Sequence, residues 1–492
     1  MPTIRNSGIS VVLATLWLCA PASLPAQTYT TLFNFNFTDG NVPTGGLVQA
    51  TDGNFYGTTV EGGSNVCKVH RTHSNPNGTN TACGTVFKIT PSGTFTTLHS
   101  FDGTDGEYPE SGVIQGVDGN FYGTTQAGGT DTSCDYGLIP GCGTIFKITP
   151  TGTFTSLHSF QLTDGATPAR KLVQGNDGNF YGATGAGGAN GDGTIFKITP
   201  SGTLTTLHSF DYTDGADLYV GLVKGTDGNF YGTTGSGGAY GDGTVFKITP
   251  GGALTTLHSF DYTDGADINA LVQGTNGNFY GTTILGGTGG NPDNTPSGTV
   301  FEITPDGTFT TIFNFDNLNN ENPGGPVVGA LIEGTGTDGN FYGLTVEGGS
   351  VGCGTAGCGT LYKITSGILT VVYSFLGQPN PGLIQGTNGI FYGETDSLEG
   401  GGDYGSIYSL SVDLSPFVET QPSSGAVGTT VKILGTDLTG ATSVTFNGTA
   451  AKFTVVSSSE ITTTVPAGAT TGELKVVMPS GTLSSNVSFM VP

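Results

Sequence analysis

The sequence predicts an all-β protein, in which a seven-bladed β-propeller is followed by an immunoglobulin-like β-sandwich. Three short sequence elements each occur seven times, and successive copies of the first lie 49 to 66 residues apart. Each repeat contains four short strands separated by turns, which is typical of a propeller blade. The repeats stop near residue 413, and alternating strands with a different spacing follow.

The three elements give the order of strands within a repeat. The first is an Asp-Gly or Asn-Gly turn followed by FYG, and its copies start at Asp52, Asp118, Asp177, Asp227, Asn276, Asp338 and Asn388. The second is a strand of the GTVF type, and its copies start at Gly84, Gly143, Gly193, Gly243, Gly298, Gly359 and Gly405. The third is a strand of the LHSF type that ends at Phe101, Phe160, Phe210, Phe260 and Phe375, with related copies from Thr30 and Thr310. A short strand before each Asp-Gly turn completes the unit, and we assign residues 27–413 to the propeller.

The two ends of the repeat region predict how the ring closes. The repeats begin at Tyr29 with a fourth-strand element and end near Asp413 after a third-strand element. One blade is therefore completed by strands from both ends of the chain. Such closure removes the open sheet edges that would otherwise invite aggregation.

Residues 1–26 predict a secretory signal peptide. They contain Arg5, the apolar run ISVVLATLWLCA and the small-residue stretch PASLPA, and we place cleavage after Ala26. The apolar run is shorter than the roughly 20 residues of a membrane-spanning helix. We therefore expect an exported protein, extracellular or at the cell surface, that is monomeric and has no membrane span in its mature form.

The charge balance narrows the range of partners. The chain has 38 acidic residues against 14 Lys and Arg, for a formal net charge of −24. Binding to nucleic acid needs the opposite balance, so we expect no nucleic-acid partner. Strong acidity in an exported protein is explained by solubility or by cation binding.

The repeats resemble the GloVer tandem-repeat family, which is found in exported bacterial proteins with varied (choice-of-anchor) ends. The resemblance covers residues 28–413 and is carried by DGNFYGTT, GG and GTVFKITPSG. It implies export and a repeat fold, and it brings no known catalytic residues.

Residues 414–492 resemble the IPT/TIG immunoglobulin-like family. The resemblance is carried by QPSSGAVGTTVKILG, VTFNGTAA, SSSEITTTVP and GELKVVMPSG. It implies a small antiparallel sandwich that packs, spaces domains or binds a partner.

Six cysteines remain after the predicted signal peptide. They form three pairs in the sequence, Cys67 with Cys83, Cys134 with Cys142, and Cys353 with Cys358. Each pair brackets the loop between the second and third strands of one blade, which in an exported chain predicts three local disulfides. A zinc site is the alternative, but the pairs lie in separate blades, so four sulfurs would not converge.

Four of the six histidines occupy one repeat position. These are His99, His158, His208 and His258, and the other copies have Phe33, Phe313 and Tyr373. A position that accepts Phe and Tyr is a packing position, so we expect no metal or acid-base role there. His70 and His73 lie in the longest cysteine loop, where they could form a small basic recognition patch or a solvated loop.

Antiparallel strand order places all long, uneven loops on one face of the disc, which also collects most of the acidic residues. Two copies of HSFDYTDGAD each bring three aspartates together, namely Asp211, Asp214 and Asp217, and Asp261, Asp264 and Asp267. This spacing could supply ligands for calcium, although a calcium site needs six to eight oxygens. Aspartates that only shape the turns are the alternative, which we favour. We expect no required cofactor.

The sequence favours an exported, non-enzymatic binding or adhesion protein. Its ligand, a glycan or another surface protein, is expected on the loop-rich acidic face. Loop tyrosines that could stack on sugar rings are Tyr108, Tyr136, Tyr212, Tyr219, Tyr240 and Tyr262. Two alternatives stay open, a polysaccharide hydrolase that uses two loop carboxylates and an architectural component of the cell envelope.

Other enzyme classes are disfavoured. A propeller followed by an immunoglobulin-like domain is similar to the secreted copper radical oxidases, but those need two histidines and two tyrosines at the metal. Sialidase-type propellers need an arginine cluster, and only Arg71 and Arg170 follow the predicted signal peptide. The chain has no phosphate loop or HExxH motif.

Overall fold

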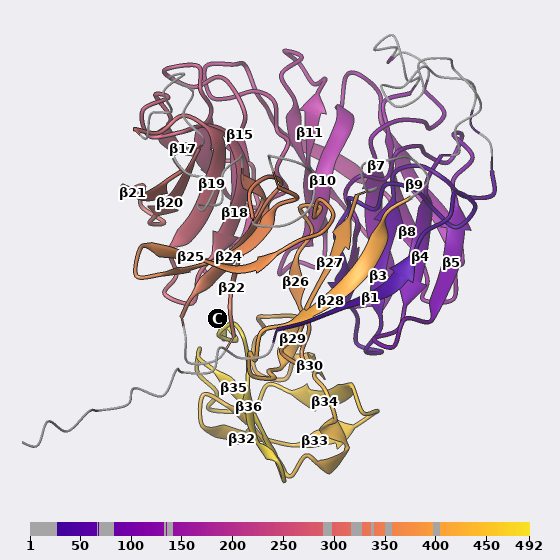
Figure 1. Ribbon diagram of the computed structural model, residues 1–492, viewed down its shortest axis with the longest axis vertical. Helices are drawn as coiled ribbons and strands as arrows, with labels where there is room; N and C mark the ends of the chain where they lie inside the picture. Colours follow the sequence, from indigo (N-terminus) through magenta and orange to yellow (C-terminus); the bar gives the residue numbers. More distant parts are fainter. Residues whose placement is uncertain are drawn as a thin grey trace, which may run out of the picture.

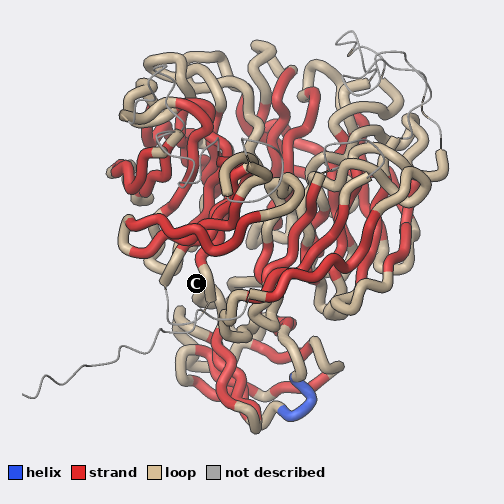
Figure 2. Tube along the Cα trace, in the orientation of Figure 1, coloured by secondary structure: helices blue, strands red, loops and turns tan. Residues whose placement is uncertain are grey.

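The computed structural model describes residues 27–65, 67, 83–131, 134, 141–288, 298–315, 327–335, 339–349, 357–396 and 404–492. The predicted signal peptide lies outside these residues. In this part of the chain nearly all regular structure is β-strand, and the single 3₁₀ turn η1 (Leu438–Gly440) belongs to the C-terminal domain (Figure 2). The predicted all-β fold class is confirmed. None of the described segments forms a helix that is long and apolar enough to cross a membrane.

Within the described residues, the repeat region forms seven four-stranded antiparallel sheets, which we number as blades 1 to 7 (Figure 1). Blade 1 contains β2 (Val48–Gln49), β3 (Phe55–Thr59), β4 (Thr85–Ile89) and β5 (Phe95–Ser100). Blade 2 contains β6 (Val113–Gln115), β7 (Phe121–Thr125), β8 (Thr144–Ile148) and β9 (Phe154–Ser159). Blade 3 contains β10 (Ala166–Gln174), β11 (Phe180–Ala186), β12 (Thr194–Ile198) and β13 (Leu204–Ser209). Blade 4 contains β14 (Val223–Lys224), β15 (Phe230–Thr234), β16 (Thr244–Ile248) and β17 (Leu254–Ser259).

The remaining three blades follow in chain order. Blade 5 contains β18 (Ala266–Gln273), β19 (Phe279–Leu285), β20 (Thr299–Ile303) and β21 (Phe309–Asn314). Blade 6 contains β22 (Val327–Glu333), β23 (Phe341–Thr345), β24 (Thr360–Thr365) and β25 (Ile368–Ser374). Blade 7 contains β26 (Ile384–Gln385), β27 (Phe391–Thr395), β28 (Ser406–Ser411) and β1 (Thr28–Asn34).

Blade 7 joins the two ends of the repeat region. Strand β1 pairs antiparallel with β28, with Thr28 opposite Ser411 and Asn34 opposite Ser406. The indigo β1 and the orange β28 lie side by side in Figure 1. The predicted completion of one blade from both ends is confirmed.

The FYG strand packs one blade against the next. In blade 1 the ring of Tyr56 stacks on Phe121 of blade 2 at a centroid distance of 3.9 Å. The Tyr56 hydroxyl donates a hydrogen bond of 2.9 Å to Asp52, so the turn aspartate fixes the ring. A side chain at Gly57 would come within 2.5 Å of the Phe87 ring, which explains why glycine follows the aromatic pair.

A belt of polar side chains also links neighbouring blades. Gln115 accepts a hydrogen bond of 3.0 Å from the backbone N–H of Thr51 in the preceding blade, and its amide donates to the Gly119 carbonyl at 3.3 Å. The equivalent belt residues are Gln49, Gln115, Gln174, Lys224, Gln273, Glu333 and Gln385. A lysine has no acceptor atom, so Lys224 cannot make the link that the others make.

The C-terminal domain consists of two four-stranded sheets. One contains β29 (Glu419–Gln421), β30 (Thr430–Leu434), β34 (Glu460–Thr464) and β33 (Phe453–Val455). The other contains β32 (Thr449–Ala451), β31 (Ser443–Phe446), β35 (Leu474–Met478) and β36 (Gly481–Ser484). Buried side chains of both sheets, such as Ile433 and Val476, form one apolar core between them.

The C-terminal domain lies against the propeller face that carries the tight Asp-Gly turns (Figure 1). Thr436 and Thr387 share a hydroxyl hydrogen bond of 2.8 Å, and the Ser459 hydroxyl donates to the Thr51 carbonyl at 3.0 Å. Lys224, the belt residue that cannot link two blades, instead reaches Ser424 of this domain at 3.5 Å.

Two opposite charges, one from each domain, interact across the contact between the domains. Lys171 occupies a position where the other blades have Gly46, Gly112, Gly221, Ala270, Ala330 and Gly382. Its side chain interacts electrostatically with Glu419 of β29. Burial lowers the pKa of Lys171 and raises the pKa of Glu419 to about 7, while the attraction between the two charges opposes both shifts.

Candidate ligand-binding face

The two faces of the propeller differ in what covers them. The C-terminal domain contacts the face with the tight turns, whereas the loops between the second and third strands and those between blades lie on the opposite face (Figure 1). We call this opposite surface the loop-rich face. It is the face on which the sequence predicts ligand binding.

Four exposed tyrosines surround blade 4 on the loop-rich face, and we call them the tyrosine patch. The exposed fractions are 51% for Tyr212, 54% for Tyr219, 67% for Tyr240 and 42% for Tyr262. The backbone holds their loops together, since the Tyr212 carbonyl accepts a hydrogen bond of 2.8 Å from Gly238, two residues before Tyr240. Exposed aromatic rings on linked loops form a surface that can stack on a ligand.

Carboxylates lie beside the tyrosine patch. Asp217 accepts hydrogen bonds from the Tyr219 hydroxyl at 3.2 Å and from the Ser236 hydroxyl at 2.5 Å. Burial raises the pKa of Asp267, the equivalent residue in the next blade, and the Asp217 charge raises it further. The patch therefore combines aromatic rings with two carboxylates that differ in their hydrogen-bonding environment.

Strained backbone marks the loops that carry these residues. Tyr212 and Tyr262 have φ angles of 63° and 66°, and Asp217 and Asp267 have φ angles of 59° and 54°. Residues with side chains rarely adopt this left-handed conformation, which clusters at binding sites and tight turns. Its recurrence at the same two positions of neighbouring loops fixes the direction of four side chains.

The other two predicted stacking tyrosines do not join the patch. Tyr108 is only 5% exposed and packs with Val60, Ala127 and Val42. This corrects the expectation that its ring is available to a ligand, because the loop turns the ring inward. Tyr136 lies outside the described residues.

The aspartates predicted as calcium ligands form hydrogen bonds within their own loops. Asp214 accepts from the backbone N–H of Asp211 at 3.2 Å, and Asp211 accepts from the Thr213 hydroxyl at 2.6 Å. Asp261 and Asp264 repeat these contacts. Across the described ranges, no group of three or more His, Cys, Asp or Glu residues is placed to hold a metal ion. Calcium binding by this face remains a prediction.

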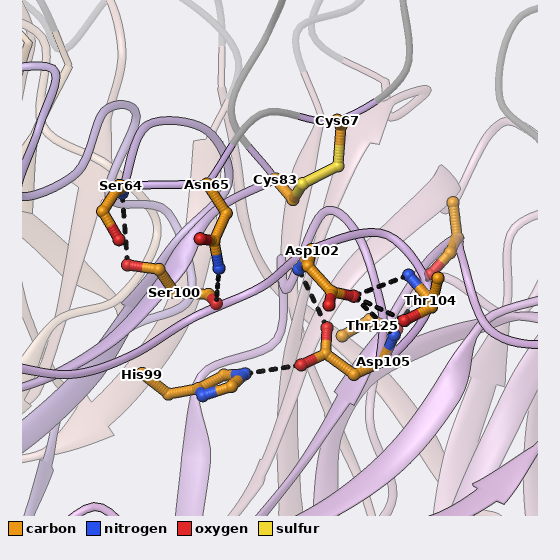
Figure 3. Close-up of a disulfide and its surroundings, with 11 residues drawn as sticks. Ser64, Asn65, Cys67, Cys83, His99, Ser100, Asp102, Thr104, Asp105 and Thr125 are labelled. Atoms are coloured by element: carbon orange, nitrogen blue, oxygen red, sulfur yellow. Dashed lines mark hydrogen bonds and ion pairs between the residues drawn. A yellow bond between two sulfur atoms is a disulfide. The ribbon is translucent and has the colours of Figure 1, made fainter.

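The repeated histidines take part in the same loops. The Nε2 atom of His208 lies 2.8 Å from a carboxylate oxygen of Asp214. Figure 3 shows the first copy, in which His99 meets Asp105 at 2.8 Å and Asp102 accepts from Thr104. The His99 ring also stacks on Phe154 at 4.0 Å, as the predicted packing position requires. The hydrogen bond to aspartate was not predicted, although the Asp lies six residues after every one of these histidines.

Two of the three predicted disulfides are present, between Cys67 and Cys83 and between Cys134 and Cys142. The first joins the base of a long loop above the His99 region (Figure 3). Cys358 is disulfide-bonded, whereas Cys353 lies outside the described residues. The bonds fasten loops of the loop-rich face to the blades.

Comparison with protein families agrees with both predicted resemblances. A model of the Gloeobacter/Verrucomicrobia repeat matches residues 21–223, 72–292 and 219–408. The chain belongs to this repeat family. An IPT/TIG domain matches residues 417–491, which covers the two sheets of the C-terminal domain. No curated protein matches the chain.

Solved structures resemble the repeat-family chain in fold. A fungal alcohol oxidase of the AA5 family in complex with copper is 12% identical with a TM-score of 0.50, covering 95% of this chain and 99% of that chain. A luciferin-regenerating enzyme is 12% identical with a TM-score of 0.39, covering 62% of this chain and 92% of its own. At this identity the similarity concerns the fold alone.

The four repeated histidines, which are the ones that the structure describes, do not fit a copper site of the kind considered above. His99, His158, His208 and His258 lie on the outer strands of four separate blades, and each is paired with an aspartate of its own loop. They therefore do not converge on one point. His70 and His73 lie outside the described residues.

Proposed function

We propose that this protein is an exported binding protein that holds a glycan on its loop-rich face. The observation that carries the proposal is the tyrosine patch beside Asp217 and Asp267. Aromatic rings cover the apolar faces of sugars, and carboxylates accept hydrogen bonds from their hydroxyls. The repeat blades and the IPT/TIG domain supply the scaffold, and a surface protein is the alternative ligand.

The position of the C-terminal domain supports this choice of face. Contacts from Ser424, Thr436 and Ser459 occupy the turns of the opposite face. The tyrosine patch is on the uncovered side, where loops differ most between blades. The disulfides hold two other loops of this face, in blades 1 and 2, to their blades.

A polysaccharide hydrolase is the second candidate, and the raised pKa of Asp267 beside Asp217 favours it. Hydrolysis of a glycosidic bond uses one carboxyl that holds its proton and one that is ionised. Asp217 and Asp267 interact electrostatically, so the two carboxyls lie near each other, as such a reaction requires.

Retention on insoluble and immobilised polysaccharides, measured while released sugar is assayed, separates the two candidates. We expect the purified protein to be retained on at least one polysaccharide without release of sugar. Running the columns with calcium and with chelator tests the calcium prediction in parallel. Release of sugar that disappears in Asp267→Asn would instead support the hydrolase. Failure of every polysaccharide to retain the protein, with no sugar released from any of them, would contradict both and direct the search to protein partners.

A further inference from the structure

The interface between blades 6 and 7 is wider than the others. The tyrosine of one FYG strand and the phenylalanine of the next have centroids 3.9 to 4.1 Å apart at six interfaces. Between Tyr342 of blade 6 and Phe391 of blade 7 the distance is 5.1 Å. The rings are also inclined by 56° there, against 27–35° at the other six interfaces, so the contact between these two blades differs from the one that the repeat makes elsewhere.

A second, outer pair of rings shows the same widening. His99 and His258 stack on the phenylalanines of the following blades at 4.0 Å, and Phe33 stacks on Phe95 at 4.1 Å. The equivalent pair between blades 6 and 7 is made of two tyrosines. Tyr373 and Tyr29 are parallel but lie 5.5 Å apart.

The sequence explains why this interface is open. In blade 1, seven residues separate Phe101 from Pro109, and Asp105 among them covers the outer ring. In blade 6, only three residues separate Phe375 from Pro379. The aspartate that caps the outer ring in blades 1 to 4 is absent from this loop, and tyrosine stands where those blades have histidine.

A pocket of about 410 Å³ occupies the opened interface. Tyr29 and Tyr373 form its aromatic wall, and Asn34, Thr31 and Asp396 bring polar groups to it. This volume lies within the range of small-molecule sites, which combine apolar walls with a few polar groups. An aromatic wall next to hydroxyl, amide and carboxylate groups suits a pyranose ring, which has an apolar face and hydroxyls at its edge.

We propose that the pocket between blades 6 and 7 binds one pyranose residue of a glycan. Tyr373 provides the aromatic wall, and Asn34 and Asp396 contact the sugar hydroxyls. This pocket is separate from the tyrosine patch around blade 4, so its occupation does not depend on the proposed function of that patch.

The test uses methyl β-glucoside, methyl β-galactoside and methyl α-mannoside as probes, with saturation-transfer NMR to detect contact and calorimetry to measure Kd. Thr31 is exposed on β1, and Thr31→Trp places an indole in the pocket without removing core packing. Thr97→Trp is the matched control, because Thr97 occupies the same repeat position at the closed interface between blades 7 and 1, where Phe33 stacks on Phe95. We expect the wild type and Thr97→Trp to bind one of the glycosides and Thr31→Trp to bind it at least tenfold more weakly.

A second variant keeps the proposal testable if the indole is accommodated elsewhere. Asp396→Ala removes a polar wall group, and we expect a loss of affinity similar to that in Thr31→Trp. Unchanged affinity in both variants, binding of none of the probes by the wild type, or loss of binding only in Tyr212→Ala would each overturn the proposal. The last outcome would assign the sugar to the tyrosine patch instead.

Discussion

The side-chain oxygen of Gln49 accepts a hydrogen bond of 2.8 Å from the backbone N–H of Thr387, and this bond links blade 1 to blade 7 across the closure of the ring. The two residues are 338 positions apart in the sequence. Elsewhere the equivalent bond joins blades that follow each other along the chain, as in Gln115 with Thr51. At the closure it adds to the pairing of β1 with β28.

Removal of the Gln49 side chain should therefore weaken the closure of the ring. Gln49→Ala leaves the Thr387 N–H without this acceptor, which we expect to cost about 1–3 kcal/mol in the free energy of unfolding. Gln174→Ala, which removes the equivalent bond to Val117, is the matched control. We expect the smaller loss in the control because chain connectivity also holds those blades together. Equal losses in urea unfolding would show that the closure has no special dependence on Gln49.

Stability should fall with rising pH because of Glu394. This carboxyl is fully buried, accepts a hydrogen bond of 3.1 Å from Gly46 of blade 1, and has a pKa that burial raises to about 8. Below the unfolded pKa near 4.5, the carboxyl is protonated in both the folded and the unfolded chain, and its favourable contribution to stability is fully present. As the pH rises towards about 8, the unfolded chain loses this proton while the folded chain keeps it, so the contribution is lost.

Glu394→Gln tests that pH dependence because it keeps the acceptor for Gly46 and removes the titration. We expect the wild type to lose on the order of a few kcal/mol relative to the variant between pH 5 and pH 8.5. Urea unfolding of both proteins at several pH values measures the difference. If the difference in the free energy of unfolding between the wild type and Glu394→Gln stays constant across this range, Glu394 is not the source of the pH dependence.

The pairing of Lys171 with Glu419 should hold the C-terminal domain against the propeller. Lys171→Met leaves Glu419 without its opposite charge, and because both residues are only partly buried we expect a cost of about 1 kcal/mol. Because Lys171→Met and Glu419→Leu each remove the same interaction, we expect the double variant to lose less than the sum of the single losses. Limited proteolysis of the segment between the domains and denaturant unfolding provide the measurements. Strictly additive losses would mean that the two charges act independently.

Alanine at both Asp214 and Asp264 should lower stability without changing any response to calcium. The two carboxylates form hydrogen bonds with His208, with His258 and with backbone N–H groups of their own turns. Their removal should therefore lower the free energy of unfolding by about 1 kcal/mol for each turn. Thermal unfolding is measured with calcium and with chelator. A calcium-dependent rise in Tm that the wild type shows and the double variant lacks would establish these aspartates as ligands.

Much of the fold could be predicted because its signals are local and repeated. The turn aspartate, the aromatic pair and the glycine of the FYG strand act within one blade and its neighbour, as the contacts of Tyr56 show. The strand order, the closure by β1 and two disulfides follow from the order of such elements along the chain.

The properties of the candidate site were harder to predict, because they depend on the direction of loop side chains. Tyr108 and Tyr212 both lie in loops between blades, yet the first is buried and the second is half exposed. The same limit applies to the opened interface at Tyr373, where a shorter loop was visible in the sequence but its effect on ring spacing was not. Loop direction and blade spacing are set by contacts between blades, and strand periodicity does not report them.

Binding by the tyrosine patch is tested most directly by retention of Tyr212→Ala/Tyr240→Ala on the polysaccharide that retains the wild type. Ile368→Ala is the control, because Ile368 is 68% exposed at the turn between β24 and β25, away from the patch. Each stacked ring contributes about 0.5–1.5 kcal/mol beyond its buried area, so we expect at least a tenfold loss of affinity in the double variant and none in the control. Equal retention of all three proteins would contradict the account.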